Sequence, residues 1–203
     1  MNLPNVLSMI RVLLVPVFVV ALLAMKDIKV WGIVVPVAVY ILTALTDMLD
    51  GKIARKYNLV TDFGKFIDPL ADKFMVIGSQ IAIMAYMFLI GEATLATVFM
   101  AVVLVILLRE LGVTSLRLVV RGNAGEVVAA SWLGKIKTVS QMVGTVVILL
   151  EPLLALFPEN GACAFLWQYH IAAYAMMAIM LVATLVSGLD YLFKYLPYIN
   201  TNE

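Results

Sequence analysis

Six long runs of apolar residues, separated by short polar breaks, constrain the fold of this chain more than any other feature. They lie at roughly 7–25, 30–50, 66–90, 94–120, 132–156 and 164–193. Each is close to the length, about 20 residues, that an α-helix needs to cross a bilayer. Because backbone polar groups must be paired internally in lipid, each run predicts a transmembrane helix. We therefore expect an all-α, polytopic membrane protein with six transmembrane helices, built as one integral-membrane domain over residues 1–203.

The composition agrees with lipid as the solvent. Apolar residues make up 64% of the chain, charged residues 13%, and the mean hydropathy is +1.06. Soluble domains average about 45–50% apolar and about 25% charged residues. A net charge of +1 lacks the basic surplus of a nucleic-acid-binding protein, so we expect no nucleic-acid partner. The single cysteine, Cys163, excludes an internal disulfide.

The basic residues predict the orientation of the spans. With six spans, both termini and the loops after the second and fourth spans share one side of the membrane. All the basic residues except Lys26 and Lys29 fall on that side. Since cytoplasmic loops are enriched in Lys and Arg, we expect both termini and the charged loops in the cytoplasm.

Four aspartates lie around the charged loop between the second and third runs. Asp47 and Asp50 are three residues apart and Asp68 and Asp72 four apart, spacings that place each pair on one helix face. Acidic side chains at a membrane boundary are costly unless they are paired. Carboxylate oxygens suit Mg²⁺ or Mn²⁺, and no Cys or His lies nearby to favour zinc. The sequence therefore predicts a divalent-metal site with coordination positions left for phosphate oxygens.

Two other interpretations of these acidic residues stay open at this point. An ion-translocation path would place its acids near the bilayer midplane, whereas these cluster at one end of the spans. Solvated loop residues would explain Asp62 and Lys56 well. They would explain Asp47 and Asp72 poorly, because each adjoins a long apolar run.

The residues beside the aspartates favour a phosphate ligand and resemble a family signature. Gly51 and Ala54 leave a shallow notch on a helix, and Arg55 offers a forked donor suited to phosphate. The pattern D-x2-D-G-x2-A-R-x8-G-x3-D-x3-D runs without departure from Asp47 to Asp72. It is identified as the signature of the CDP-alcohol phosphatidyltransferase family. Residues 2–11, 62–73, 109–110, 134–138 and 187–191 further resemble the branch that makes phosphatidylglycerophosphate, with Ser8 where that branch usually has Thr.

The resemblance implies the CDP-alcohol phosphotransferase fold, a homodimer and roles for single residues. Asp47 and Asp68 would bridge two Mg²⁺ ions, with Mn²⁺ as the alternative. Asp50 would bind the first ion and Asp72 the second, and Asp72 would also accept the proton of the attacking alcohol. The positions that match CDP-lipid-binding residues are Asn5, Gly51, Arg55 and Thr61. For Asn5, an ordinary helix N-cap is an equal alternative.

A phosphate-bearing acceptor would need further cations on the cytoplasmic side. The candidates are Arg109, Arg117, Arg121, Lys135 and Lys137. Arg109 follows an apolar run, and Arg117, eight residues on, falls within about a quarter turn of the same helix face. Lys135 and Lys137 diverge, so at most one of them faces the site. Topology-setting charge accounts for Arg121 and Lys137, and we predict Arg109, Arg117 and Lys135 as the acceptor-phosphate residues.

The implied activity is transfer of a phosphatidyl group from CDP-diacylglycerol to sn-glycerol 3-phosphate, at the cytoplasmic face of the cell membrane. The same chemistry with phosphatidylglycerol, inositol phosphate or serine is one alternative, and a cation-coupled transporter is another. Cys163 and His170 are expected across the bilayer from the aspartates. The sequence therefore argues against a Cys–His nucleophilic pair.

Overall fold

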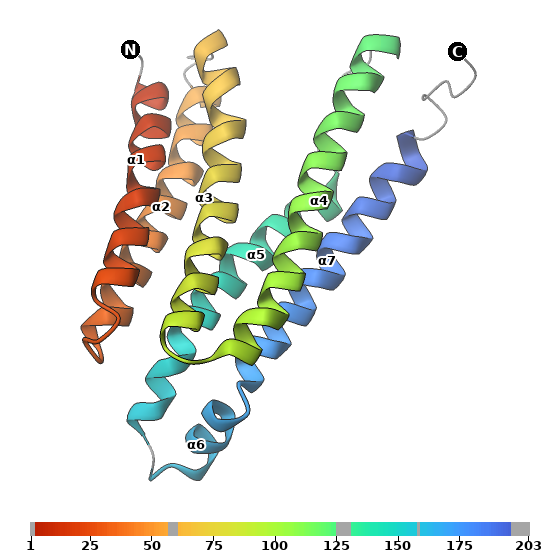
Figure 1. Cartoon of the computed structure of the whole chain (residues 1–203). Coiled ribbons are helices and arrows are strands. Elements are labelled where there is room, and N and C mark those ends of the chain that lie inside the picture. Colours follow the sequence, from red (N-terminus) through yellow and green to blue (C-terminus); the bar gives the residue numbers. More distant parts are fainter. Residues whose placement is uncertain (1–2, 57–60, 125–130, 158, 196–203) are drawn as a thin grey trace.

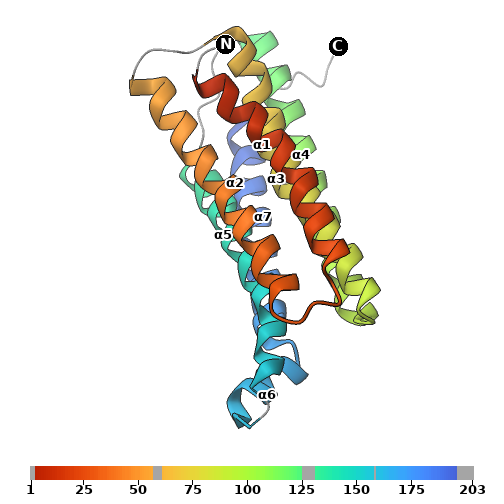
Figure 2. The same ribbon diagram turned by 90° about the vertical axis from the view of Figure 1, so that its left-hand side faces the viewer.

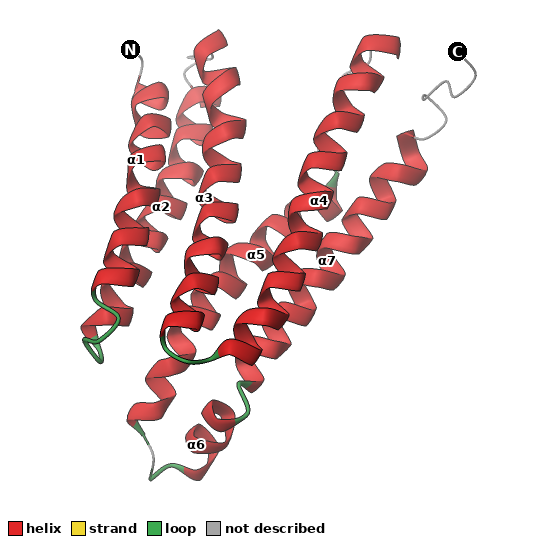
Figure 3. Ribbon diagram, in the orientation of Figure 1, coloured by secondary structure: helices red, strands yellow, loops and turns green. Residues whose placement is uncertain are grey.

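The computed structural model describes residues 3–56, 61–124, 131–157 and 159–195, without the side chains of residues 3–4, 48–56, 65 and 121–124. Every element in these ranges is a helix (Figure 3). The elements are α1 (Leu3–Ala24), α2 (Trp31–Lys56), α3 (Asp62–Leu89), α4 (Ala93–Ala124), α5 (Trp132–Leu150), the 3-10 helix η1 (Glu151–Leu156), α6 (Gly161–Gln168) and α7 (Ile171–Tyr195). The all-α prediction is confirmed for this part of the chain.

The long helices form two groups that meet along the bundle (Figure 1). In the first group, α1 packs against both α2 and α3, and in the second, α7 packs against α4 and α5. Contacts of α3 with α4, and of α5 with α2 and α3, join the groups. The start of α1, the start of α3 and the ends of α4 and α7 lie toward one end of the bundle, and α6 lies at the other (Figures 1 and 2).

The bundle is apolar inside and outside, as expected of a protein surrounded by lipid. Phe18 of α1, Tyr40 of α2 and Phe99 of α4 are core residues no more than 2% exposed. The Phe18 and Tyr40 rings pack with their centroids 5.7 Å apart. On the outer face, Leu13 and Leu104 are 65% and 57% exposed. Five described helices are long and apolar enough to cross a membrane, and the apolar segment Trp31–Asp47 of α2 is shorter. The chain is thus a multi-pass membrane protein.

Several predicted helix boundaries differ from those in the structure. The predicted sixth span, 164–193, is divided into α6 and α7, because His170 between them adopts a left-handed backbone with φ of 48°. The fourth predicted run ends at 120, but α4 continues to Ala124, and the second ends at 50, but α2 continues to Lys56. Polar residues end the membrane-spanning part of a helix, but the helix itself can extend into water. The number of spans therefore stays a prediction.

The turn between α3 and α4 requires a glycine. Gly91 has φ of 90°, a conformation that a residue with a Cβ rarely adopts. Its N–H donates to the carbonyl of Phe88 at 3.2 Å, and the N–H of Glu92 donates to Met87 at 2.9 Å. These bonds pair the last carbonyls of α3 and return the chain into α4.

Candidate functional site

Three of the predicted aspartates surround the N-terminal part of α1. Asp47 comes from α2, and Asp68 and Asp72 come from the first turns of α3. The Arg11 guanidinium of α1 lies between two of them, with Nη1 2.7 Å from Asp47 Oδ1 and also paired with Asp72 Oδ1. The Arg11 side chain is 1% exposed, so its charge is held inside the bundle. We call Asp47, Asp68 and Asp72 with Arg11 and Ser8 the aspartate cluster.

Ser8 positions the remaining aspartate from the same face of α1. Its hydroxyl donates to Asp68 Oδ1 at 2.6 Å, and Ser8 itself is fully buried. Ser8 and Arg11 are three residues apart, so one helix face reaches all three carboxylates. The helix α1 therefore orients aspartates that come from both α2 and α3.

The start of α3 is tied to α1 through Asn5 and Thr61. Thr61 caps α3, accepting a hydrogen bond from the N–H of Gly64 at 3.0 Å. Asn5 Nδ2 donates to the Thr61 hydroxyl at 2.9 Å, and that hydroxyl is 3.0 Å from Asn5 Oδ1. A Cβ on Gly64 would lie 2.9 Å from Asn5 Oδ1, so a larger residue here would displace the Asn5 side chain. Asn5 lies within α1, which begins at Leu3, so the N-cap alternative is wrong.

The other predicted donor-site residues lie outside the described side chains. Asp50, Gly51 and Arg55 belong to α2, and their side-chain positions are not part of the description. Among the described side chains, no three His, Cys, Asp or Glu residues form a ready-made metal site. The predicted set of four metal ligands therefore stays a prediction.

The chemistry of the aspartate cluster nevertheless fits a hard divalent cation. Its acidic groups are all carboxylates, which are oxygen donors of the kind that Mg²⁺ and Mn²⁺ prefer. Asp47 and Asp72 already accommodate a positive charge between them, that of Arg11. Their side chains are 27% and 52% exposed, so neither carboxylate is sealed inside the bundle.

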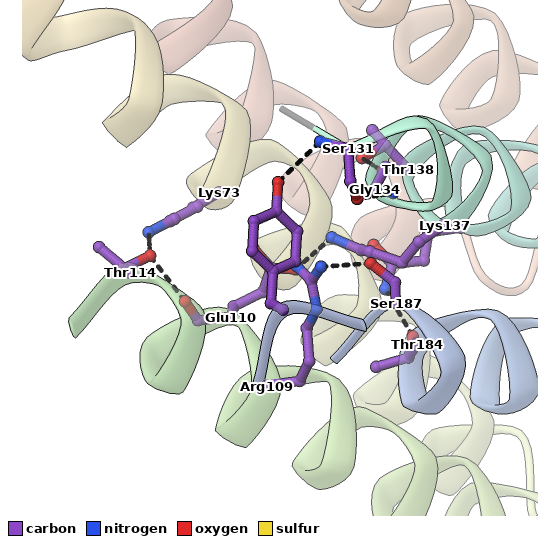
Figure 4. Close-up of polar contacts among 12 residues, drawn as sticks. Lys73, Arg109, Glu110, Thr114, Ser131, Gly134, Lys137, Thr138, Thr184 and Ser187 are labelled. Carbon is purple, nitrogen blue, oxygen red and sulfur yellow. Dashed lines mark hydrogen bonds and ion pairs between the residues drawn. The ribbon is translucent and has the colours of Figure 1, made fainter. Parts of the chain in front are cut away.

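A second set of charged groups lies between α4, α5 and α7 (Figure 4). The Glu110 carboxylate of α4 binds two cations through one oxygen: Arg109 Nη1 at 3.1 Å and Lys137 Nζ of α5. Arg109 also donates through Nη2 to the hydroxyl of Ser187 on α7. The side chains of Arg109, Glu110 and Lys137 are 11%, 13% and 7% exposed. We call Arg109, Arg117 and Lys137 with Glu110 the basic cluster.

Arg117 completes the basic cluster and has its own partner on α7, Tyr191, which lies one turn after Ser187. Its Nη2 donates to the Tyr191 hydroxyl, and its guanidinium carbon lies 4.8 Å from the centre of the Tyr191 ring. The same ring is 5.6 Å from the guanidinium carbon of Arg109. Among the described residues, the buried Nε atoms of Arg109 and Arg117 have no hydrogen-bond partner. Each guanidinium thus keeps one N–H donor that no described residue accepts from.

A contact between α3 and α4 lies between the two clusters. Lys73, next to Asp72 on α3, donates to the Thr114 hydroxyl of α4. Thr114 in turn donates to the backbone carbonyl of Glu110 at 2.7 Å. The neighbour of Asp72 on α3 is thereby linked to the backbone of Glu110 on α4 (Figure 4).

The structure brings two of the three predicted acceptor residues together. Arg109 and Arg117 share Tyr191, as the helix spacing suggested. Lys135 is exposed and lies instead with its Nζ 5.8 Å from the centre of the Trp132 ring. Lys137, which we had attributed to topology, is the lysine that reaches the interior. The two lysines do diverge, as the sequence indicated, and the orientation of α5 turns Lys137, not Lys135, toward the interior.

Sequence reasoning assigned no role to five residues that the structure places in these clusters. They are Ser8, Arg11, Glu110, Ser187 and Tyr191. All five lie in segments that resembled the family. The available signal was an ionisable or polar residue within an apolar run, which must find a partner in the bundle interior.

His170 lies at the opposite end of the bundle from the aspartate cluster. Its Nε2 is 3.2 Å from Glu92 Oε2 and its Nδ1 is 3.4 Å from Glu151 Oε2. Glu151 is 4% exposed and also accepts the N–H of Ala173 at 3.0 Å. These bonds join the α3–α4 turn, η1 and the start of α7, so His170 has a structural role away from the aspartates.

Known proteins match this chain over most of its length. It is 39% identical over 217 residues to a Bacillus subtilis protein named CDP-diacylglycerol–glycerol-3-phosphate 3-phosphatidyltransferase, covering 100% of this chain and 99% of that one. Proteins of the same name from Salmonella paratyphi A and Yersinia enterocolitica are 31% and 35% identical, over 94% and 75% of this chain and 93% and 79% of theirs. The sequence profile of CDP-alcohol phosphatidyltransferases matches residues 1–188. With these matches and the aspartate motif, the chain belongs to the CDP-alcohol phosphatidyltransferase family.

Proposed function

We propose that this chain transfers the phosphatidyl group of CDP-diacylglycerol to sn-glycerol 3-phosphate, giving phosphatidylglycerophosphate and CMP. Relatives that carry this activity in their names match the chain nearly end to end. The observation that carries the proposal is the pairing of an aspartate cluster with a basic cluster across α3 and α4. The first suits a metal-bound pyrophosphate and the second suits the phosphate of the acceptor.

The substrates fit a site at one end of a membrane-spanning bundle. We place this end at the cytoplasmic face of the cell membrane, because most of the basic residues fall on that side of the predicted topology. There the acyl chains of CDP-diacylglycerol can stay in the bilayer while its headgroup reaches the aspartates. Glycerol 3-phosphate and CMP are soluble and exchange with the cytoplasm. We further propose that residues 1–203 form a single catalytic domain and that the protein is a homodimer.

Members of this family generally require a divalent metal ion. We assign two Mg²⁺ ions, with Mn²⁺ as the alternative, to Asp47, Asp50, Asp68 and Asp72. When bound, such ions neutralise phosphate oxygens and make the phosphorus more electrophilic. Ser8 orients Asp68 for this role, and Arg11 orients Asp47 and Asp72.

The chain's own residues then carry out binding and proton transfer. Arg109 and Arg117 hold the acceptor phosphate, using their buried Nε donors. Asp72 takes the proton from the 1-hydroxyl of glycerol 3-phosphate. The resulting oxygen forms a bond to the phosphorus next to diacylglycerol, and the bond from that phosphorus to the bridging oxygen of CMP breaks. CMP leaves with the electron pair, and Arg55 and Thr61 hold the nucleotide lipid.

Substitution of Asp72 tests the reaction. Asp72→Asn removes the base and one metal ligand, so CMP release from CDP-diacylglycerol in the presence of Mg²⁺ and glycerol 3-phosphate is expected to fall at least about 100-fold. Asp27→Asn is the matched control, since Asp27 lies in the α1–α2 turn with its side chain 82% exposed. Near wild-type turnover in Asp72→Asn would contradict the assigned base.

An acceptor panel tests the second substrate. Purified protein with CDP-diacylglycerol and Mg²⁺ is offered glycerol 3-phosphate, phosphatidylglycerol, inositol phosphate and serine in turn. Glycerol 3-phosphate is expected to give the highest rate, because Arg109 and Arg117 offer a phosphate-binding site. Preference for serine or phosphatidylglycerol, which lack a phosphate monoester, would overturn the assignment.

A further inference from the structure

We propose that Tyr191 is a positioning residue that holds Arg117 against the acceptor phosphate and ties it to the first turn of α5. The inference rests on the proposed function and extends it to a residue of α7. It starts from one phenol of α7, which contacts two arginines of α4 and the backbone N–H of Ser131 at the start of α5.

The Tyr191 side chain contacts both arginines of the basic cluster. Its ring lies 4.8 Å from the guanidinium carbon of Arg117 and 5.6 Å from that of Arg109, within the range of cation–π attraction. Its hydroxyl oxygen accepts a hydrogen bond from Arg117 Nη2. Two independent contacts, one to the ring and one to the hydroxyl, therefore hold Arg117 in one orientation.

Tyr191 is itself immobilised from two sides. The side chain is 1% exposed and packs in an apolar cluster with Val113, Leu116 and Val120 of α4. Its hydroxyl also accepts the backbone N–H of Ser131 at 2.9 Å, and Ser131 is the N-cap of α5. The phenol oxygen thus joins α4, α5 and α7 at one point.

The neutrality of the phenol is what suits it to this role. Among the described residues, Arg117 forms no ion pair with a carboxylate, whereas Arg109 and Lys137 share Glu110. A carboxylate partner would neutralise Arg117, but a phenol orients the guanidinium and leaves its positive charge for an anion. The buried Nε of Arg117, unpartnered in the described residues, is the donor that this arrangement leaves for the acceptor phosphate.

Steady-state kinetics of Tyr191→Phe test the inference, because the variant removes only the hydroxyl. The KM for glycerol 3-phosphate is expected to rise about ten-fold, which corresponds to about 1.4 kcal/mol. The KM for CDP-diacylglycerol and kcat are expected to stay within about two-fold of wild type. Tyr174→Phe is the matched control, since Tyr174 lies near the start of the same helix.

A second pair of variants tests the link to α5 without touching the phenol. Ser131 has φ of −73°, which proline can adopt, so Ser131→Pro removes the N–H while Ser131→Ala keeps it. Both variants lose the side-chain cap to Gly134. Only Ser131→Pro is expected to raise the KM for glycerol 3-phosphate further, in the direction of Tyr191→Phe.

The outcomes separate this inference from the proposed function. No CMP release by the wild-type protein with glycerol 3-phosphate would overturn both. Wild-type turnover with an unchanged acceptor KM in Tyr191→Phe would overturn the positioning role alone. Equal losses for both substrates, with a lowered melting temperature, would show that Tyr191 is only structural and would also overturn it.

Discussion

Replacing Glu110 by glutamine is expected to be among the most destabilising single changes in this bundle. Glu110 is the shared anion of Arg109 and Lys137, and all three side chains are at most 13% exposed. Glutamine keeps the shape but leaves both cations inside the bundle without a counter-charge. Removing one partner of a buried ion pair costs about 3–5 kcal/mol, and we expect a loss in that range.

The shared oxygen makes the effects of the two partners unequal. In Lys137→Met the carboxylate keeps Arg109 Nη1 at 3.1 Å, so no buried charge is left alone. The loss is then expected near the value of one charged hydrogen bond, about 1.5–3 kcal/mol. In the double variant Glu110→Gln with Lys137→Met, only Arg109 is left without a counter-charge, whereas Glu110→Gln alone leaves both cations without one. The double variant is therefore expected to lose less stability than the sum of the two single variants.

Reversible unfolding in mixed micelles measures these free energies, with thermal melting in detergent as a second readout. Glu159→Gln is the control, because Glu159 is exposed before α6. A Lys137→Met variant less stable than Glu110→Gln, or single losses that add fully in the double variant, would refute the shared-anion account.

Three further predictions use the same assays. Arg11→Gln removes the cation paired with two aspartates, so the melting temperature without divalent ions is expected to fall by about 4–8 °C. Added Mg²⁺ should restore the melting temperature of the variant. An equal Mg²⁺ response in variant and wild type would contradict this role of Arg11. Gly64→Ala places a Cβ 2.9 Å from Asn5 Oδ1 and is expected to raise the KM for CDP-diacylglycerol. Gly112→Ala is the control, because no atom lies within 4 Å of the added Cβ, and it should neither impair the kinetics nor lower the melting temperature. His170→Gln breaks the contacts with Glu92 and Glu151 at the opposite end of the bundle, so the melting temperature should fall by about 2–6 °C while kcat stays within about two-fold of wild type. A large loss of kcat would contradict the purely structural role of His170.

The fold class and the donor motif were predictable because each is local in the sequence. Apolar runs of bilayer length indicate helices wherever they occur. The three- and four-residue spacings placed aspartate pairs on common helix faces before any packing was known. The split of the last predicted span was not predictable in this way, since it depends on the left-handed backbone of His170 within an otherwise apolar segment.

The partners inside the bundle were harder to predict, because lipid removes the usual signal. In a soluble helix the polar face marks the outside, but here exposed and buried faces are both apolar. The rotation of α5 that turns Lys137 inward and Lys135 outward is therefore not encoded in a hydrophobic pattern. Arg11 pairs with an aspartate 61 residues away, a contact that only the packing of α1 against α3 creates.

The position of α1 has a consequence for how the protein is made. The described contacts of Asn5, Ser8 and Arg11 with the aspartates and with Thr61 all fall within the first 72 residues. Chains fold from the N-terminus during synthesis, so this half of the site can assemble once three helices have entered the membrane. The basic cluster needs Ser187 on the last helix. A chain halted after α3 would therefore contain the aspartate cluster without the basic cluster.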